Sequence, residues 1–176
     1  METQELLQRA EELLKVFTES TTRPEENRMD VYITAENIKP AVKALLIDGG
    51  WGYLSAITGL DCPDYEIDET TKEKVAVAGK GHLEALYHFC EVAAVVTLRV
   101  QLPYENPHIE SICDLIPSVS FFEREAMELL GINFDNTPIT AHLILPDSWP
   151  EGVYPLRKTF RGLDKEQKGN METENG

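Results

Sequence analysis

Residues 94–102 carry the pattern that most restricts the fold of this chain. Apolar residues stand at positions 96, 98, 100 and 102 and polar residues at 97, 99 and 101. This period of two places all the apolar side chains on one face of a β-strand. Residues 84–90 come before this run and are separated from it by a short turn, so the two segments predict a β-hairpin. Because one face of 94–102 is entirely apolar, we expect it to be the central strand of a sheet.

The segments before this hairpin alternate between predicted helices and strands. Residues 3–17 repeat apolar side chains at spacings of three and four, and residues 37–48 do the same after Asn37, which is a good helix cap. Short strands are expected at 31–33 and 51–58. The pattern indicates an α+β fold in a single domain, with a mixed sheet of about four strands packed by helices on one face.

Three segments lack this regularity. Residues 18–28 are polar and contain Pro24, and residues 61–81 are rich in acidic side chains and show little periodicity. Both are predicted to be loops. Residues 109–115 are expected to form a short helix that leads into the C-terminal third of the chain.

Composition excludes several classes of function. The formal net charge is -15 at pH 7, so nucleic acid and anionic lipid headgroups are repelled over most of the surface. No apolar run approaches the roughly 20 residues needed to cross a bilayer, and the N-terminus lacks the layout of a signal peptide. We therefore expect a cytosolic chain that has no nucleic-acid partner and does not insert into a membrane. A partner protein can still hold the chain at a membrane.

The cysteines and histidines argue against a metal centre. Cys62, Cys90 and Cys113 are far apart and show no CxxC spacing, whereas an iron–sulfur cluster usually needs four thiolates. His88 and Cys90 share a face of the predicted hairpin, but no third or fourth zinc ligand is evident. We expect reduced thiols and no cofactor or metal in this chain.

A second informative region opens with a helix that reads SFFEREAMELLGINF. Ser120 and Glu123 have the spacing of a capping box, and Gly131 marks the end of the helix. Arg124 lies in a strongly acidic stretch. Two interpretations of it remain open, since its guanidinium either clamps two carboxylates of its own chain or bridges to a neighbouring protein.

The segment that follows contains the most basic part of an acidic chain. Residues 152–162, GVYPLRKTFRG, hold three bases and no acid. Pro155 favours extended backbone outside helices and sheets, and arginine with aromatic residues is typical of interfaces; the alternative is an arm that folds back to neutralise its own acidic helix. We predict a domain at residues 1–162, which includes an extended docking arm at 139–162, and a disordered tail at 163–176.

These residues together suggest a family. The ERE of the helix, its closing GINF and the LPDSWPEGVYPLRKTF of the arm resemble the 30-kDa subunit family of the NADH:quinone oxidoreductases. The resemblance is specific over Phe121 to Phe160 and is strongest to the version in membrane-bound energy-converting hydrogenases and sulfur-reducing complexes. The NADH-oxidising branch usually has His-Pro where this chain has Thr137-Pro138, which favours the hydrogenase or sulfur-reducing branch without choosing between them.

The resemblance implies a non-catalytic subunit in the peripheral arm of a membrane-bound, ion-translocating respiratory complex, on the cytoplasmic side. Such a subunit braces a large hydrogenase-like subunit and an iron–sulfur small subunit, and it meets antiporter-like membrane subunits only indirectly. It has no cofactor of its own, and the iron–sulfur clusters and any nickel–iron centre belong to its partners. The implied interface residues are Glu123, Arg124, Glu125, Glu128, Gly131, Phe134, Pro138, Trp149, Tyr154, Pro155, Leu156, Arg157 and Lys158.

Two other functions remain open at this stage. Glu125 and Glu128 lie one helical turn apart and can act as the acid/base pair of a stand-alone acidic enzyme, although no nucleophile or glycine-rich loop accompanies them. A transient assembly factor can use the same arm to bind its client. Stoichiometry in the mature complex separates such a factor from a permanent subunit.

Overall fold

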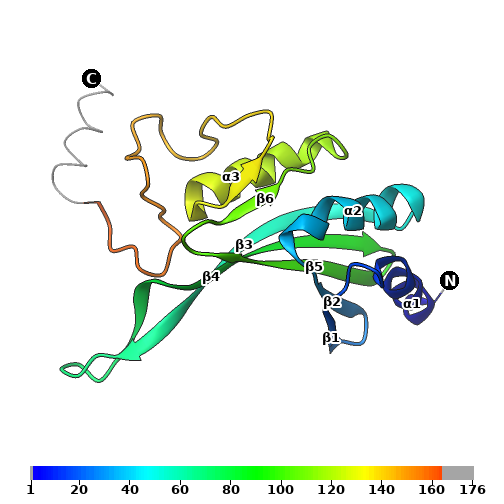
Figure 1. Ribbon diagram of the computed structural model, residues 1–176, viewed down its shortest axis with the longest axis horizontal. Coiled ribbons are helices and arrows are strands. Elements are labelled where there is room, and N and C mark those ends of the chain that lie inside the picture. Colours follow the sequence, from blue (N-terminus) through cyan, green and yellow to red (C-terminus); the bar gives the residue numbers. More distant parts are fainter. Residues whose placement is uncertain (1, 164–176) are drawn as a thin grey trace.

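The central strand of the sheet is β5 (Ala94–Pro103), as its alternating pattern predicts. In the computed structural model, which describes residues 2–163, β5 lies between β2 (Arg28–Tyr32), which runs parallel to it, and β4 (Lys74–Glu91), which is antiparallel. The edge strands are β1 (Ser20–Glu25) beside β2 and β3 (Tyr53–Ile67) beside β4. The α+β class and the mixed sheet are confirmed, with five strands in place of about four (Figure 1).

The helices bury one face of this sheet. α1 (Thr3–Leu14) is followed by β1 and β2, and then by a 3-10 turn at Ala35–Asn37, α2 (Ile38–Val42) and a π-helical segment at Lys43–Asp48. The apolar sides of these helices join the inward residues of β4 and β5 in one core. α1 ends three residues before the predicted boundary, and the Asn37 side chain makes no capping bond.

The predicted loop at 61–81 is wrong. Strands β3 and β4 continue through it as a long antiparallel hairpin, paired out to Ile67 and Lys74. The pairing of β4 with β5 ends at His82 and Pro103, so the rest of the hairpin projects as a two-stranded ribbon (Figure 1). The sequence does not alternate there because neither face of the ribbon packs on a core.

Two shorter strands also differ from the sequence-based prediction. The loop expected at residues 18–28 is wrong, because β1 pairs with β2 as an edge strand, where Pro24 is tolerated beside an irregularity in the register. The predicted helix at 109–115 is wrong, because β6 (His108–Glu110) pairs in parallel with β7 (Asn133–Asp135). A three-residue strand is too short to show a period.

α3 (Ser120–Leu130) packs against β3 and is the helix that bears the predicted site. Residues 136–163 after β7 contain neither helix nor strand; within them we call 139–162 the arm. The arm doubles back through turns and lies beside α3 (Figure 1), whereas the sequence predicts a simply extended run. Of the predicted tail at 163–176, all but Leu163 lies outside the described residues.

Candidate docking surface

The buried side of α3 is fixed by Glu123. Its carboxylate is fully buried and accepts hydrogen bonds from the Ser111 hydroxyl (2.8 Å), the Ile112 amide (3.1 Å) and the Cys113 thiol (3.2 Å). The predicted capping box is therefore wrong, since Ser120 makes no side-chain cap. Glu123 ties α3 to the segment after β6 and leaves no surface for a partner.

Glu128 holds the arm against α3. Its side chain is almost fully buried and accepts four hydrogen bonds from one turn of the arm. The donors are the ring Nδ1 of His142 and the successive amides of Leu143, Ile144 and Leu145, at 2.7–3.3 Å. Burial alone raises the pKa of Glu128, but the backbone amides and His142 outweigh it and keep that pKa below its ordinary value.

Arg124 clamps the same turn from the other side. Its Nε and Nη2 donate to the carbonyls of Ala141 (2.9 Å) and His142 (2.7 Å). The guanidinium therefore holds its own chain, but through carbonyl groups and not through the carboxylates of the predicted clamp. Because Glu128 takes the amides and Arg124 the carbonyls, residues 141–145 are fixed to α3 by both kinds of backbone group.

Arg157 seals the C-terminal end of α3. The last carbonyls of a helix have no partner within it, and here Leu129 accepts the Leu156 amide (3.0 Å) while Leu130 accepts Nε of Arg157 (2.7 Å). The guanidinium lies between the rings of Tyr104 and Tyr154, at 5.0 and 4.9 Å from their centroids. Burial lowers the pKa of Arg157, which stays protonated.

Gly131 ends α3 in the left-handed conformation (φ 74°), as its position predicts. A side chain there has no room, because a Cβ would lie 2.5 Å from the ring of Tyr154. Further along the arm, the indole of Trp149 donates to the Val153 carbonyl (2.7 Å) and lies against Phe160. The three aromatic residues of the arm are thus half-buried, Tyr154 against the end of α3 and Trp149 and Phe160 against each other.

The arm therefore folds back, in agreement with one of the two predictions, but not by neutralising acidic residues. Within residues 2–163, Arg124 and Arg157 form no ion pair with a carboxylate, and Lys158 reaches Asp61 through its backbone amide and not through its ammonium group. Asp61 and Tyr104 are anchors of the arm that the sequence did not reveal. Asp61 lies in β3 and Tyr104 directly follows β5, and no local pattern links them to residues 154–158.

One face of α3 stays open beside the arm. A groove of 150 Å³ lies between β3 and α3, and Leu156 of the arm contributes to its lining. Leu156 lines this groove and is 56% exposed, and Glu125 is an exposed acid on its wall. Phe121, which is 57% exposed, precedes Glu125 by one helical turn and so lies on the same side of α3. We call this region the groove face; it comprises Ile57, Thr58, Gly59, Phe121, Phe122, Glu125, Ala126, Leu129, Leu130 and Leu156.

The remaining predicted interface residues divide between surface and interior. Phe134 is buried in β7 and cannot meet a partner. Pro138 and Lys158 are exposed, and Pro155 is half-buried. Of the predicted set, the exposed residues are Glu125, Pro138, Leu156 and Lys158. Glu123, Arg124, Glu128 and Arg157 instead form hydrogen bonds within the chain.

The described residues give no support to an acid/base pair. Glu128 is ionised and saturated by donors from the arm, while Glu125 lies on the exposed face of α3. An acid/base pair has to share a proton, but both oxygens of Glu128 already accept hydrogen bonds, which favours the ionised form. Both ring nitrogens of His88 have hydrogen-bond partners, since they lie 3.1 Å from the hydroxyls of Thr58 and Thr97.

The structure thus combines a five-stranded sheet with an arm that is hydrogen-bonded to α3 beside a groove of mainly apolar side chains. The profile of the family described as "Respiratory-chain NADH dehydrogenase, 30 Kd subunit" matches residues 31–166. The chain belongs to this family. The match begins in the last two residues of β2 and covers β3, β4, β5 and all of the groove face.

Relatives from three organisms share the family. The chain is 29% identical over 146 residues, 82% of each chain, to a subunit of the F(420)H(2) dehydrogenase of Methanosarcina mazei. It is 41% identical over 71 residues to the beta subunit of the membrane-bound hydrogenase of Pyrococcus furiosus, covering 40% of this chain and 41% of that one. It is 26% identical over 153 residues to a subunit of the NADH-quinone oxidoreductase of Moorella thermoacetica, covering 86% of this chain and 92% of that one.

Solved structures share the fold. A chain of the archaeal membrane-bound sulfane sulfur reductase aligns over 94% of this chain and 89% of its own length, with a TM-score of 0.68 and 17% identity. The trypsin-resistant fragment of Nqo5 aligns over 79% of this chain and 99% of its own, with a TM-score of 0.57 and 23% identity. No helix in residues 2–163 has the length and apolar character to span a membrane.

Proposed function

We propose that this chain is a non-catalytic subunit of the peripheral arm of a membrane-bound oxidoreductase complex. Family membership over residues 31–166 carries the proposal. Relatives bear the names of subunits of F420H2 dehydrogenase, membrane-bound hydrogenase and NADH-quinone oxidoreductase. In this proposal the chain has no redox cofactor of its own, and the iron–sulfur clusters and any nickel–iron centre sit in partner subunits on the cytoplasmic side of the membrane.

The groove face is the proposed contact with a partner subunit. The apolar side chains of Phe121 and Leu156 are exposed to water, and burying a large apolar side chain contributes about 1.5–3 kcal/mol to binding. Glu125 on the groove wall favours a partner that offers an apolar side chain with a basic residue next to it. The large hydrogenase-like subunit and the iron–sulfur small subunit are the partners that the family resemblance implies.

The bonds of the arm support a bracing role. Arg124, Glu128 and Arg157 fix the arm to α3 before any partner arrives, so docking does not have to order a loose segment. A preorganised surface is what electron-transfer centres require, because their rates depend on fixed spacing. Antiporter-like membrane subunits meet this chain only through the other subunits.

Affinity purification from solubilised membranes tests the proposal. Wild-type chain should co-purify at equal stoichiometry with a large subunit and with iron-bearing proteins, measured by mass spectrometry and metal analysis. Phe121→Glu and Leu156→Glu should weaken this association about 30-fold or more, the scale of an interface hot spot. Val16→Glu is the matched control, because Val16 is 82% exposed and follows α1, outside the groove face.

The alternatives give different results. A substoichiometric amount of the chain in the mature complex indicates a transient assembly factor. A soluble iron-free monomer with hydrolytic activity indicates a stand-alone enzyme. If all three variants co-purify like the wild type, the groove face is not the interface, whereas loss of association in Val16→Glu as well points to a general effect of the added charge.

A further inference from the structure

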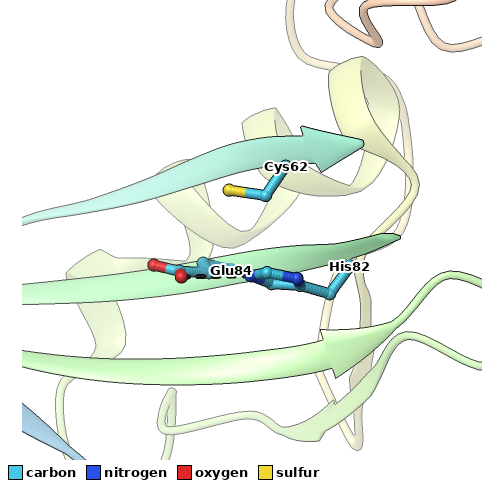
Figure 2. A group of neighbouring side chains, drawn as sticks. All are labelled: Cys62, His82 and Glu84. Carbon is cyan, nitrogen blue, oxygen red and sulfur yellow. Dashed lines mark hydrogen bonds and ion pairs between the residues drawn. The ribbon is translucent and has the colours of Figure 1, made fainter. Parts of the chain in front are cut away.

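Three side chains able to bind a metal gather at the point where the hairpin leaves the sheet. Cys62 on β3 is directly opposite His82 on β4, and Glu84 lies two residues further along β4 on the same face. Their sulfur, nitrogen and oxygen atoms lie within 4.8 Å of one another. Figure 2 shows the three side chains on these neighbouring strands. We propose that Cys62, His82 and Glu84 form a zinc-binding site.

The donor set selects the metal. Thiolate, imidazole and carboxylate are the three protein ligands that zinc takes, whereas calcium and magnesium prefer oxygen alone. In a tetrahedral zinc site the ligand atoms are roughly 3.3–3.8 Å apart. Small side-chain movements therefore close the cluster around an ion. A thiolate with a carboxylate supplies two negative charges, which balance the charge of one zinc ion.

The neighbours of Glu84 leave one of its oxygens for the metal. The guanidinium of Arg99 binds Oε2 through Nε and Nη2, whereas Oε1 is 3.2 Å from Nε2 of His82 and 3.4 Å from Nε2 of Gln101. Asp30 also pairs with Arg99 at 3.1 Å and offsets its positive charge. A carboxylate that is oriented through its second oxygen is typical of metal ligands. Zinc would replace the His82–Glu84 contact without disturbing Arg99.

The site is accessible and incomplete by itself. The side chain of Glu84 is 5% exposed, but that of His82 is 36% exposed. Three protein ligands leave a fourth position, which water or a side chain of a docked partner fills. Because Cys62 and His82 stand on different strands, an ion there joins β3 to β4 at the last rung that β5 supports. The proposed role is to fix the direction of the projecting ribbon.

A cobalt and zinc titration of the metal-stripped full-length chain tests the site. Cobalt should bind in a 1:1 ratio with a thiolate-to-cobalt charge-transfer band, and zinc should displace it. Cys62→Ser should abolish the band, and both Cys62→Ser and His82→Gln should weaken zinc binding by more than the roughly 10- to 100-fold cost of a change beside the ligands. Cys90→Ser is the matched control, since Cys90 is a half-buried thiol on the same face of β4.

The variants leave Glu84 in place because its loss strands the charge of Arg99. Circular dichroism of each variant confirms that it is folded. A wild-type chain that gives no charge-transfer band overturns the proposal, and so does zinc binding that survives both Cys62→Ser and His82→Gln. In either case the cluster is only an ion-pair network around Arg99. An equal loss of binding in Cys90→Ser would also overturn it, by moving the thiolate elsewhere.

Discussion

Replacing Glu128 with glutamine tests whether one carboxylate holds the arm on α3. In the wild type, Oε1 accepts the Ile144 amide at 2.7 Å, and Oε2 accepts Nδ1 of His142 and the amides of Leu143 and Leu145. Glutamine keeps one oxygen and places an NH2 group where the other was. At least one amide of the arm then loses its acceptor and faces a donor.

The size of the effect follows from these bonds. A hydrogen bond to a charged group contributes about 1.5–3 kcal/mol net, and the other bonds lose their charge assistance. We expect the free energy of opening of residues 142–145 to fall by about 2–3 kcal/mol, which corresponds to roughly 30- to 150-fold faster amide exchange. Because the arm opens without the sheet, the exchange of the β4 and β5 amides should not change.

Hydrogen exchange with mass spectrometry measures this opening segment by segment. Glu125→Gln is the control, since it is the same substitution one turn away on the exposed face of α3. Unchanged exchange of residues 142–145 in Glu128→Gln would refute the reasoning. An equal effect of Glu125→Gln would also do so, because it would trace the loss to net charge.

Three further outcomes follow. The pKa of Glu128 is lowered in the folded state, so its stabilisation of the arm is complete above the ordinary pKa of a glutamate and is lost as pH falls through the folded-state pKa. Amide exchange in the arm, corrected for intrinsic rates, should therefore become faster in acid in the wild type but not in Glu128→Gln. Gly131→Ala should lower the free energy of unfolding, measured in urea, by about 1–3 kcal/mol, because alanine is strained at this positive φ and its methyl group displaces Tyr154. Gly152→Ala has a similar φ but open space around it, so it should lower that free energy by no more than about 1 kcal/mol. Tyr87→Phe should raise the free energy of unfolding by about 1 kcal/mol, measured by thermal denaturation, since its buried hydroxyl has no partner within residues 2–163.

Local signals predicted the parts of this fold that are stabilised locally. The alternation of 94–102 indicated the central strand, the spacing of apolar residues indicated α1, and Gly131 indicated the end of α3. Each of these signals is contained within a few neighbouring positions of the sequence, so the pattern could be interpreted without knowledge of distant partners. The predictions failed where no period can show: β1 and the outer part of the β3–β4 hairpin bury almost no side chains, and β6 is short and needs the distant β7 to form.

The partners predicted for the side chains of α3 and the arm were wrong for a related reason. Charge suggested that Arg124 and Arg157 seek carboxylates, but both donate to backbone carbonyls. Motif spacing suggested that Glu123 caps its own helix, but Ser111, from outside the helix, occupies its carboxylate. Sequence identifies these side chains as donors and acceptors. It does not show which backbone groups the fold leaves unpaired.

The parallel pairing of β2 with β5 sets the order in which the chain can fold as it is made. Residues 28–32 find their partner only when residues 95–99 have been synthesised, and α1 packs on β5 as well. The N-terminal elements must therefore wait, with their apolar sides uncovered, while the long hairpin emerges from the ribosome. A pause in translation before residue 95 extends that exposure, so codon choice in this stretch should affect the yield of folded protein.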